Sequence, residues 1–343
     1  MPAAPSEQPC AFGDWSPIVF GEADPPPLSD VGRKALQKAI REQCETFYSY
    51  SRARAILTVA VRLSNVADGQ RVLRETRGRW DTNRLSPTWE WPPTSGSERI
   101  RCDEFRLGSL FIHGLASYNE LILLDNRGIG DSTDDGRPFD IARLADDVTQ
   151  VIERLGLERV SMLGWSMGGF IAQTLALQHP SRVNKLILLS TDSGGSEADL
   201  ASAAVWSQLV DASGTPHDQA KRLLSLLFPS DVAESFYRKF GDIVAAARAR
   251  LSPDLINRQA AAMDEWHRNG AGDRLRGINA PVLIATGSQD VVIPPSNALK
   301  LVNAIPNAWL AQFPHGGHAF MAQYPRQLAD LINCFLAIEA AKL

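Results

Sequence analysis

A serine flanked by glycines stands between an apolar run and a helical pattern near the middle of the chain. The segment from Gly164 to Gly169 reads Gly-Trp-Ser-Met-Gly-Gly; apolar residues 160–163 precede it and the apolar pattern 170–177 follows. Glycines on both sides let a strand and a helix approach closely, so the turn holds Ser166 at strained backbone angles with its hydroxyl raised. This pattern predicts a nucleophile, whereas the simpler interpretation is a serine that only caps the following helix.

A serine hydroxyl is a weak nucleophile at neutral pH. It needs an imidazole to take its proton and a carboxylate to orient that imidazole. The C-terminal third of the chain supplies both, each on a loop that follows an apolar run: Asp290 comes after residues 281–286, and His318 comes after residues 309–313. Two other residues compete for these roles, because His315 lies just before His318 and Asp192 follows the apolar run 186–189.

The elements that must position these residues alternate along the chain. Short apolar runs typical of buried strands are separated by segments with helical periodicity, and the runs are 109–112, 121–125, 160–163, 186–189, 281–286 and 309–313. This alternation predicts an α/β fold with a doubly wound, mostly parallel sheet. Between 192 and 280 the strand signal disappears and four helical patterns follow one another, at 198–210, 219–227, 232–249 and 253–266. We expect these residues to form a helical cap above the sheet.

The first hundred residues are less regular. Residues 1–29 are rich in proline and predict a flexible leader. Residues 30–108 form an uncertain N-terminal segment, with a helical pattern over 31–47 and a possible hairpin made by 56–61 and 70–76 around the turn dipeptide Asp68-Gly69.

Composition excludes several classes of function. The 343 residues carry 35 basic and 39 acidic side chains, a net charge of -4 without long runs of one sign, so nucleic acid is not an expected partner. The four cysteines form no CxxC pair, so no zinc site is expected. No apolar stretch reaches the length of a membrane span, and residues 1–29 lack the basic and apolar regions of a secretory signal. We therefore expect a cytoplasmic protein, and no oligomeric state follows from the sequence.

Five motifs in this order resemble the α/β-hydrolase superfamily, in particular its small soluble esterases, enol-lactonases and cofactor-free haloperoxidases. The motifs occupy 111–114, 125–132, 164–169, 286–290 and 317–318. The resemblance implies that Ser166 is the nucleophile, His318 the general base and acid, and Asp290 the orienting carboxylate. His318 is preferred to His315 because the family places its base directly after a glycine, and Asp290 is preferred to Asp192 because its motif is fuller.

The resemblance also implies a function and an organisation. The function is hydrolysis of a small carboxylic ester or lactone through an acyl-enzyme, with no cofactor and no metal. The backbone N–H groups of Met167 and Leu115 would form the oxyanion hole. The hydrolase core would consist of residues 109–191 and 281–343, separated by the cap at 192–280. Two alternatives stay open: a cofactor-free haloperoxidase or perhydrolase that uses the same triad, and a catalytically impaired binding protein.

One departure from the family pattern bears on activity. Only eight residues, His113 to Glu120, separate two expected parallel strands, whereas a parallel crossover takes about a dozen residues or more. The oxyanion loop is therefore predicted to be shortened. Losing one oxyanion donor costs about 10²- to 10³-fold in rate, so reduced activity is expected.

Overall fold

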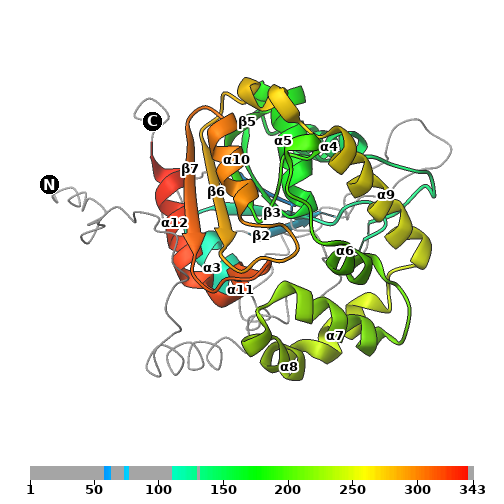
Figure 1. Ribbon diagram of the computed structural model, residues 1–343. Coiled ribbons are helices and arrows are strands. Elements are labelled where there is room, and N and C mark those ends of the chain that lie inside the picture. Colours follow the sequence, from blue (N-terminus) through cyan, green and yellow to red (C-terminus); the bar gives the residue numbers. More distant parts are fainter. Residues whose placement is uncertain (1–57, 63–72, 77–109, 130–131, 339–343) are drawn as a thin grey trace, which may run out of the picture. The chain divides into compact units, whose positions relative to one another are not determined.

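A single mixed sheet organises the part of the chain that the structure describes, which is residues 58–62, 73–76, 110–129 and 132–338 of a computed structural model (Figure 1). In these residues seven strands follow the order β2-β3-β1-β4-β5-β6-β7. Their bounds are β1 (Thr58–Arg62), β2 (Leu73–Thr76), β3 (Glu120–Leu124), β4 (Val160–Trp165), β5 (Val183–Leu189), β6 (Val282–Gly287) and β7 (Ala308–Phe313).

Most neighbouring strands of the sheet are parallel. The exception is β1, which is antiparallel to both of its neighbours, so that Val59 lies opposite Leu123 of β3 and Leu163 of β4. The strands from β4 to β7 pair in parallel one after another. Their carboxyl ends therefore meet at one edge of the sheet, which is where open α/β sheets bind ligands.

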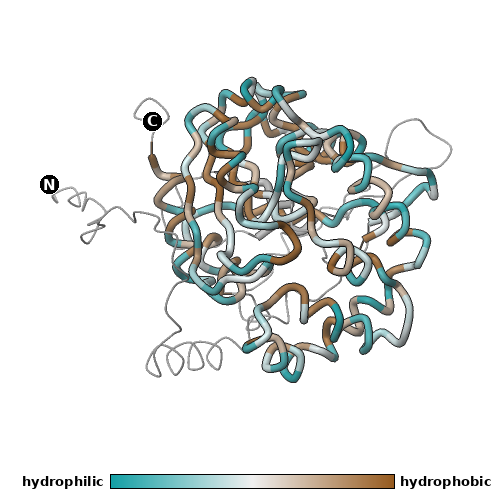
Figure 2. The backbone as a smooth tube through the Cα atoms, in the orientation of Figure 1, coloured by the Kyte–Doolittle hydropathy of each residue, from teal (hydrophilic) through white to brown (hydrophobic). Residues whose placement is uncertain are grey.

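Helices cover both faces of the sheet, as the predicted α/β class requires (Figure 1). One face is covered by α4 (Ile141–Arg154), α5 (Met167–Gln178) and α10 (Ser296–Ala304), and alternate strand residues such as Ile122 and Leu124 join their core. The other face carries α3 (Leu110–Ala116), the short α11 (Phe320–Gln323) and α12 (Pro325–Ala337). Figure 2 shows the hydrophobic residues gathered along the strands between these layers.

A buried lysine ties β5 to the end of α12. The ammonium of Lys185 donates to the carbonyl oxygens of Phe335 at 2.8 Å and Leu336 at 3.0 Å, and also to that of Ile338. The last carbonyls of a helix lack intrahelical partners, so a cation satisfies them. Burial lowers the pKa of Lys185, which is the cost of placing this charge inside the fold.

Two predictions about local structure are wrong. Residues 110–112, the described part of the strand expected at 109–112, do not form a strand, because this apolar run belongs to α3, whose buried residues Phe111, Ile112, Leu115 and Ala116 lie on one helical face. A short apolar run is compatible with a buried helix or a buried strand, and periodicity alone does not separate them. The expected hairpin is also absent from the described residues, because β3 lies between β1 and β2.

In the sheet, β1 occupies the position between β3 and β4. The short connection before β3 therefore joins the helix α3 to a strand. The minimum length of a crossover between two parallel strands does not apply to such a connection. The predicted leader at 1–29, the helical pattern at 31–47 and the segment 78–108 lie outside the described residues.

Every residue between β5 and β6 is described, and this insertion contains helices only. They are the 3-10 turns η2 (Gly195–Glu197) and η3 (Gly272–Gly277) and the helices α6 (Ala203–Val210), α7 (Pro216–Leu227), α8 (Ser230–Arg248) and α9 (Pro253–Asn269). The rings of Phe228 and Phe236 stack at 3.8 Å between α7 and α8, which gives the insertion an apolar core of its own. None of the described helices is both long enough and apolar enough to cross a membrane.

The packing of β4 against α5 depends on Gly164. A Cβ atom at this position would lie 2.2 Å from the carbonyl oxygen of Gly168, far inside van der Waals contact. At Gly277, by contrast, a Cβ atom would lie 3.8 Å from the side chain of Leu177, which is ordinary contact.

Gly164→Ala is accordingly expected to destabilise the fold by about 2 kcal/mol or more, because a methyl group forced against backbone must push β4 and α5 apart. Gly277→Ala serves as the control and is expected to change stability by less than about 0.5 kcal/mol. Urea denaturation followed by circular dichroism measures both. Equal stability of the two variants would contradict this account of the turn.

Candidate active site

Ser166 occupies the sharp turn between β4 and α5. Its backbone angles are φ 56° and ψ -127°, a region that side-chain-bearing residues rarely adopt. Three hydrogen bonds hold the turn: the Ser166 N–H donates to Leu189 O at 3.0 Å, while its carbonyl accepts from Gly169 N at 2.8 Å and from Thr191 Oγ1 at 3.0 Å. A strained conformation persists only where its surroundings impose it, so these hydrogen bonds hold the half-buried Ser166 in the turn.

The structure brings His318 and Asp290 together. Nδ1 of His318 lies 2.9 Å from Oδ2 and 3.1 Å from Oδ1 of Asp290, and the residues are only 2% and 4% exposed. The carboxylate is fixed in turn by the backbone N–H groups of Val292 and Ile293, which both donate to Oδ1 at 2.9 Å. A carboxylate facing Nδ1 assigns the proton to that nitrogen and leaves Nε2 as a proton acceptor.

The competing histidine has a different environment. His315 Nδ1 lies 3.2 Å from Gln289 Nε2, and its backbone N–H donates to Ser288 Oγ at 2.8 Å. His318 is also the histidine tied to the serine strand, because Trp165 Nε1 donates to its carbonyl oxygen at 2.9 Å. Among the described residues no hydrogen bond joins the Ser166 hydroxyl to His318. In ligand-free enzymes this bond is often long and tightens when substrate binds.

The competing aspartate, Asp192, belongs to a second pair. Its Oδ1 accepts from the N–H of Gly194 at 2.8 Å and from Nε1 of Trp266 at 3.1 Å, while Oδ2 lies 3.6 Å from Nε2 of His267. Asp192 is 1% exposed. No sequence motif connects His267 with Asp192, so the sequence alone does not reveal this pair.

The two expected oxyanion donors are in different situations. Met167 is the first residue of α5, so its N–H belongs to the four that a helix leaves without an internal partner. Leu115 is the sixth residue of α3, where its N–H is used inside the helix, and its carbonyl accepts from the side chain of Asn119. Leu115 is not among the residues that line the cavity at Ser166.

A cavity of about 370 Å³ opens beside Ser166. Its walls come from α5, the Asp192 loop, the cap helices α6 and α9, and the residues after Asp290. Apolar side chains form most of the lining, namely Phe170, Leu200, Ala201, Ala203, Trp206, Leu209, Met263, Val292 and Ile293; polar and charged residues complete it, namely Ser166, Asp192, Asp199, Asp264, His267 and Arg268. This volume fits a small organic molecule. Among the described residues no cluster of three or more His, Cys, Asp or Glu side chains could hold a metal.

Comparison with known proteins agrees with this geometry. Residues 110–323, well over half of the chain, match the family described as alpha/beta hydrolase fold. The chain belongs to this family. It is 30% identical over 239 residues to the "Putative carbamate hydrolase RutD" of Caulobacter sp. (strain K31), covering 67% of this chain and 85% of that protein.

Two further relatives show the range of the alpha/beta hydrolases that this chain resembles. The "Putative non-heme bromoperoxidase BpoC" of Mycobacterium tuberculosis (strain ATCC 25618 / H37Rv) is 29% identical over 241 residues, which cover 66% of this chain and 86% of that protein. The structure of the enol-lactonase from Burkholderia xenovorans LB400 superposes with a TM-score of 0.59 at 18% identity, covering 82% of this chain and 97% of that chain. At this identity the superposition shows the shared fold.

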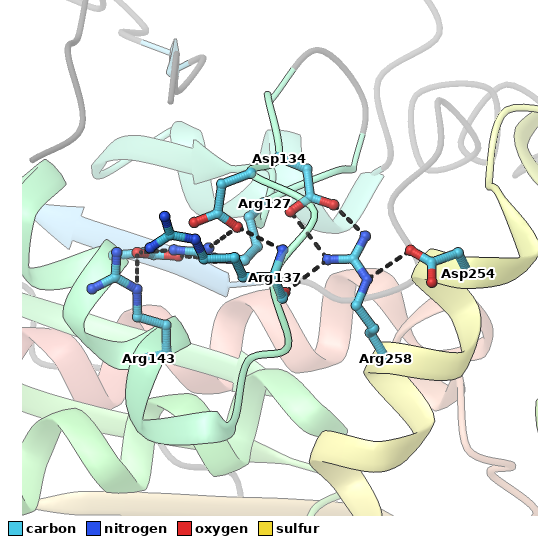
Figure 3. A network of polar contacts seen from close by, with 8 residues as sticks. Arg127, Asp134, Arg137, Arg143, Asp254 and Arg258 are labelled. Atoms are coloured by element: carbon cyan, nitrogen blue, oxygen red, sulfur yellow. Dashed lines mark hydrogen bonds and ion pairs between the residues drawn. The ribbon is translucent and has the colours of Figure 1, made fainter. Parts of the chain in front are cut away.

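A polar network anchors the cap helix α9 to the loop after β3 (Figure 3). Arg258 of α9 binds the carboxylate of Asp134 through both terminal nitrogens and donates to the carbonyl oxygen of Arg137 at 3.1 Å. The loop itself is fixed by Arg127, whose buried guanidinium makes two 2.8 Å hydrogen bonds to Asp147 of α4. Because α9 also carries Met263 and His267, this network helps to set the position of the cavity wall.

Arg258 contacts two carboxylates that differ in exposure, so the exposed one can serve as the control for the less exposed one. The side chain of Asp134 is 19% exposed, whereas that of Asp254 is 73% exposed. Asp134→Asn is expected to lower the free energy of unfolding by about 1–3 kcal/mol, because a half-buried charge-assisted hydrogen bond is lost. Asp254→Asn is expected to cost less than about 0.5 kcal/mol, since it removes only an exposed pair. Urea denaturation of the two variants distinguishes these values, and a larger effect at Asp254 would contradict the role of Asp134.

The effect of Asp134→Asn on the free energy of unfolding is expected to depend on pH. Burial by itself favours the protonated form of Asp134, but the hydrogen bond and charge of Arg258 outweigh it and hold the pKa of Asp134 below its usual value. The unfolded chain therefore binds this proton at higher pH than the folded chain does. The difference in stability between wild type and Asp134→Asn should be complete above about pH 4 and shrink as the pH falls below that value.

Proposed function

We propose that this chain is a serine hydrolase that cleaves a small carboxylic ester or lactone through Ser166, His318 and Asp290. The observation that carries the proposal is the buried His318–Asp290 pair, 2.9 Å between Nδ1 and Oδ2, on the loops that follow β7 and β6 at the same edge of the sheet as the Ser166 turn. A serine alone at a tight turn is compatible with a helix cap. The combination with an oriented imidazole is what a nucleophile requires.

The reaction would proceed in two halves. His318 Nε2 takes the proton of Ser166, whose Oγ forms a bond to the substrate carbonyl carbon while the alcohol oxygen leaves and receives that proton. Water then gives a proton to His318 and attacks the acyl-enzyme, which releases the acid and restores the serine. For a lactone the leaving alcohol stays attached to the acyl group, so water delivers a single hydroxy acid.

The oxyanion hole is expected to be incomplete. The N–H of Met167 is the first of α5 and lacks a partner inside the helix, so it would stabilise a developing negative charge together with the helix N-terminus. The N–H of Leu115 is engaged within α3, so the second donor that the family pattern implies does not come from this residue. We expect turnover below that of a complete hydrolase, by about 10²- to 10³-fold.

The substrate class follows from the cavity and the relatives. A mostly apolar space of about 370 Å³ accepts a short acyl compound. One similar protein is named a putative carbamate hydrolase and another an enol-lactonase, and both names support cleavage at a carboxylic carbonyl group. The bromoperoxidase name of another relative supports a second candidate, in which hydrogen peroxide replaces water at the acyl-enzyme and a peracid is released.

A fluorophosphonate probe tests the nucleophile directly. The wild-type chain is expected to be labelled in proportion to time and probe concentration, because an activated serine displaces fluoride from the probe and is phosphonylated. Ser166→Ala removes the attacking oxygen and should abolish labelling while the protein keeps its circular dichroism spectrum. A folded wild type that takes up no probe would overturn the proposal, and the binding-protein alternative would then stand.

The two histidines provide a second test. His318→Ala is expected to lower kcat/KM for para-nitrophenyl acetate by about 10²- to 10⁴-fold, the usual contribution of a general base. His315→Ala removes a comparable side chain from the same loop and should change kcat/KM by less than about threefold, since its ring contacts Gln289 rather than Asp290. A larger loss in His315→Ala would reassign the base.

A further inference from the structure

A buried aspartate and a partly buried histidine that the proposed reaction does not use, Asp192 and His267, line the cavity beside Ser166. Asp192 Oδ1 is occupied by two donors, the N–H of Gly194 and Nε1 of Trp266. Oδ2 has no hydrogen-bond donor within reach among the described residues, and its nearest polar neighbour is His267 Nε2 at 3.6 Å. Asp192 and His267 both line the cavity together with Ser166.

The pair is held rigidly. The His267 ring packs edge-on against Phe170 and Trp206, with ring centroids 5.8 Å and 5.4 Å apart. The backbone of Asp192 is fixed by Gln173, which donates to its carbonyl oxygen at 2.9 Å. The next residues are clamped to α9 as well, since a Cβ atom at Gly194 would lie 2.3 Å from Trp266 O. A polar group held in place in this way is a prepared binding site.

The distance between Asp192 Oδ2 and His267 Nε2 determines which chemical group can bind between them. A gap of 3.6 Å is too long for a direct hydrogen bond, but one oxygen atom can lie within hydrogen-bond distance of both ends. Such an atom must donate to the Asp192 carboxylate, and it accepts from His267 in the tautomer that carries its proton on Nε2. A hydroxyl group does both at a single atom, whereas a carboxylate can only accept and would meet the charge of Asp192.

We propose that Asp192 and His267 form a subsite that binds a hydroxyl group of the substrate. The preferred ester or lactone therefore carries a hydroxyl group in addition to the carbonyl group that reacts. The inference rests on the proposed hydrolase function. A neutral hydroxyl fits this subsite, a plain alkyl chain leaves Oδ2 of Asp192 without a hydrogen-bond donor, and a carboxylate-bearing chain is repelled.

Asp192→Asn provides a sharp test. The change preserves size and can keep the Oδ1 contacts to Gly194 and Trp266, while Oδ2, the atom that faces the cavity, becomes an amide donor. The substrates are para-nitrophenyl hexanoate, its ω-hydroxy counterpart and its ω-carboxy counterpart, with n-butyl and hydroxybutyl acetate to place the hydroxyl on the alcohol side. The readout is the ratio of kcat/KM within each pair.

Wild type is expected to prefer the hydroxyl-bearing member of at least one pair by about tenfold or more and to disfavour the carboxylate. In Asp192→Asn the hydroxyl preference should fall to about twofold or less, and discrimination against the carboxylate should relax. A general disturbance of the fold would lower all rates together and leave these ratios unchanged.

His267→Phe is the second variant and keeps the proposal testable if Asp192→Asn does not fold. Phenylalanine retains the ring contacts to Phe170 and Trp206 but removes the nitrogens, so the hydroxyl preference should again fall. The matched controls are Asp242→Asn and His217→Phe, which make the same substitutions in an exposed Asp–His pair of the cap, 3.1 Å apart and outside the cavity. They should leave every ratio unchanged.

The outcomes separate the two proposals. Ester hydrolysis that depends on Ser166 but shows no hydroxyl preference, or a preference that survives Asp192→Asn and His267→Phe, overturns the subsite and leaves the hydrolase function intact. Absence of both probe labelling and hydrolysis overturns the hydrolase function and the subsite with it.

Discussion

The close approach of β4 to α5 is the constraint on which the candidate site depends. Gly164 allows the carbonyl of Gly168 to lie where any side chain would collide, and the chain can turn this sharply only with Ser166 at positive φ. The cost of that conformation is met by the hydrogen bonds from Ser166 to Leu189 and from Thr191 to Ser166. The turn thus places a hydroxyl at the carboxyl edge of the sheet and the N-terminus of α5 beneath it.

The parallel strands then bring distant residues to that edge. Asp290 follows β6 and His318 follows β7, so the order of strands in the sheet determines that their side chains meet although 28 positions separate them. The antiparallel β1 alters the other half of the site. It occupies the sheet position next to β4, and residues 110–116 pack as α3 against α12 instead. Residues 110–116 therefore have a structural role in the packing of this face of the sheet.

The cap contributes one wall of the cavity. Its helix α9 is fixed at one end by Arg258 and the loop after β3, and at the other end by the contacts of Trp266 and Gly270 with the Asp192 loop. Between these anchors lie Met263 and His267, which face Ser166 across the cavity. One aspartate–histidine pair, Asp290 and His318, therefore lies on the loops after β6 and β7, and a second pair, Asp192 and His267, lines the cavity together with Ser166.

The sequence alone determined the strand–turn–helix around Ser166, the alternation that makes an α/β fold, the helical cap and the candidacy of Asp290 and His318. These features follow from local periodicity, glycine spacing and the order of motifs, which can be recognised within short stretches of sequence. Only the tertiary structure decided that residues 110–116 are helical, that β1 enters the sheet, and that Asp192 pairs with His267 rather than with His318. Each of these depends on which surfaces meet across 50 or more residues of chain, and no local pattern records that choice.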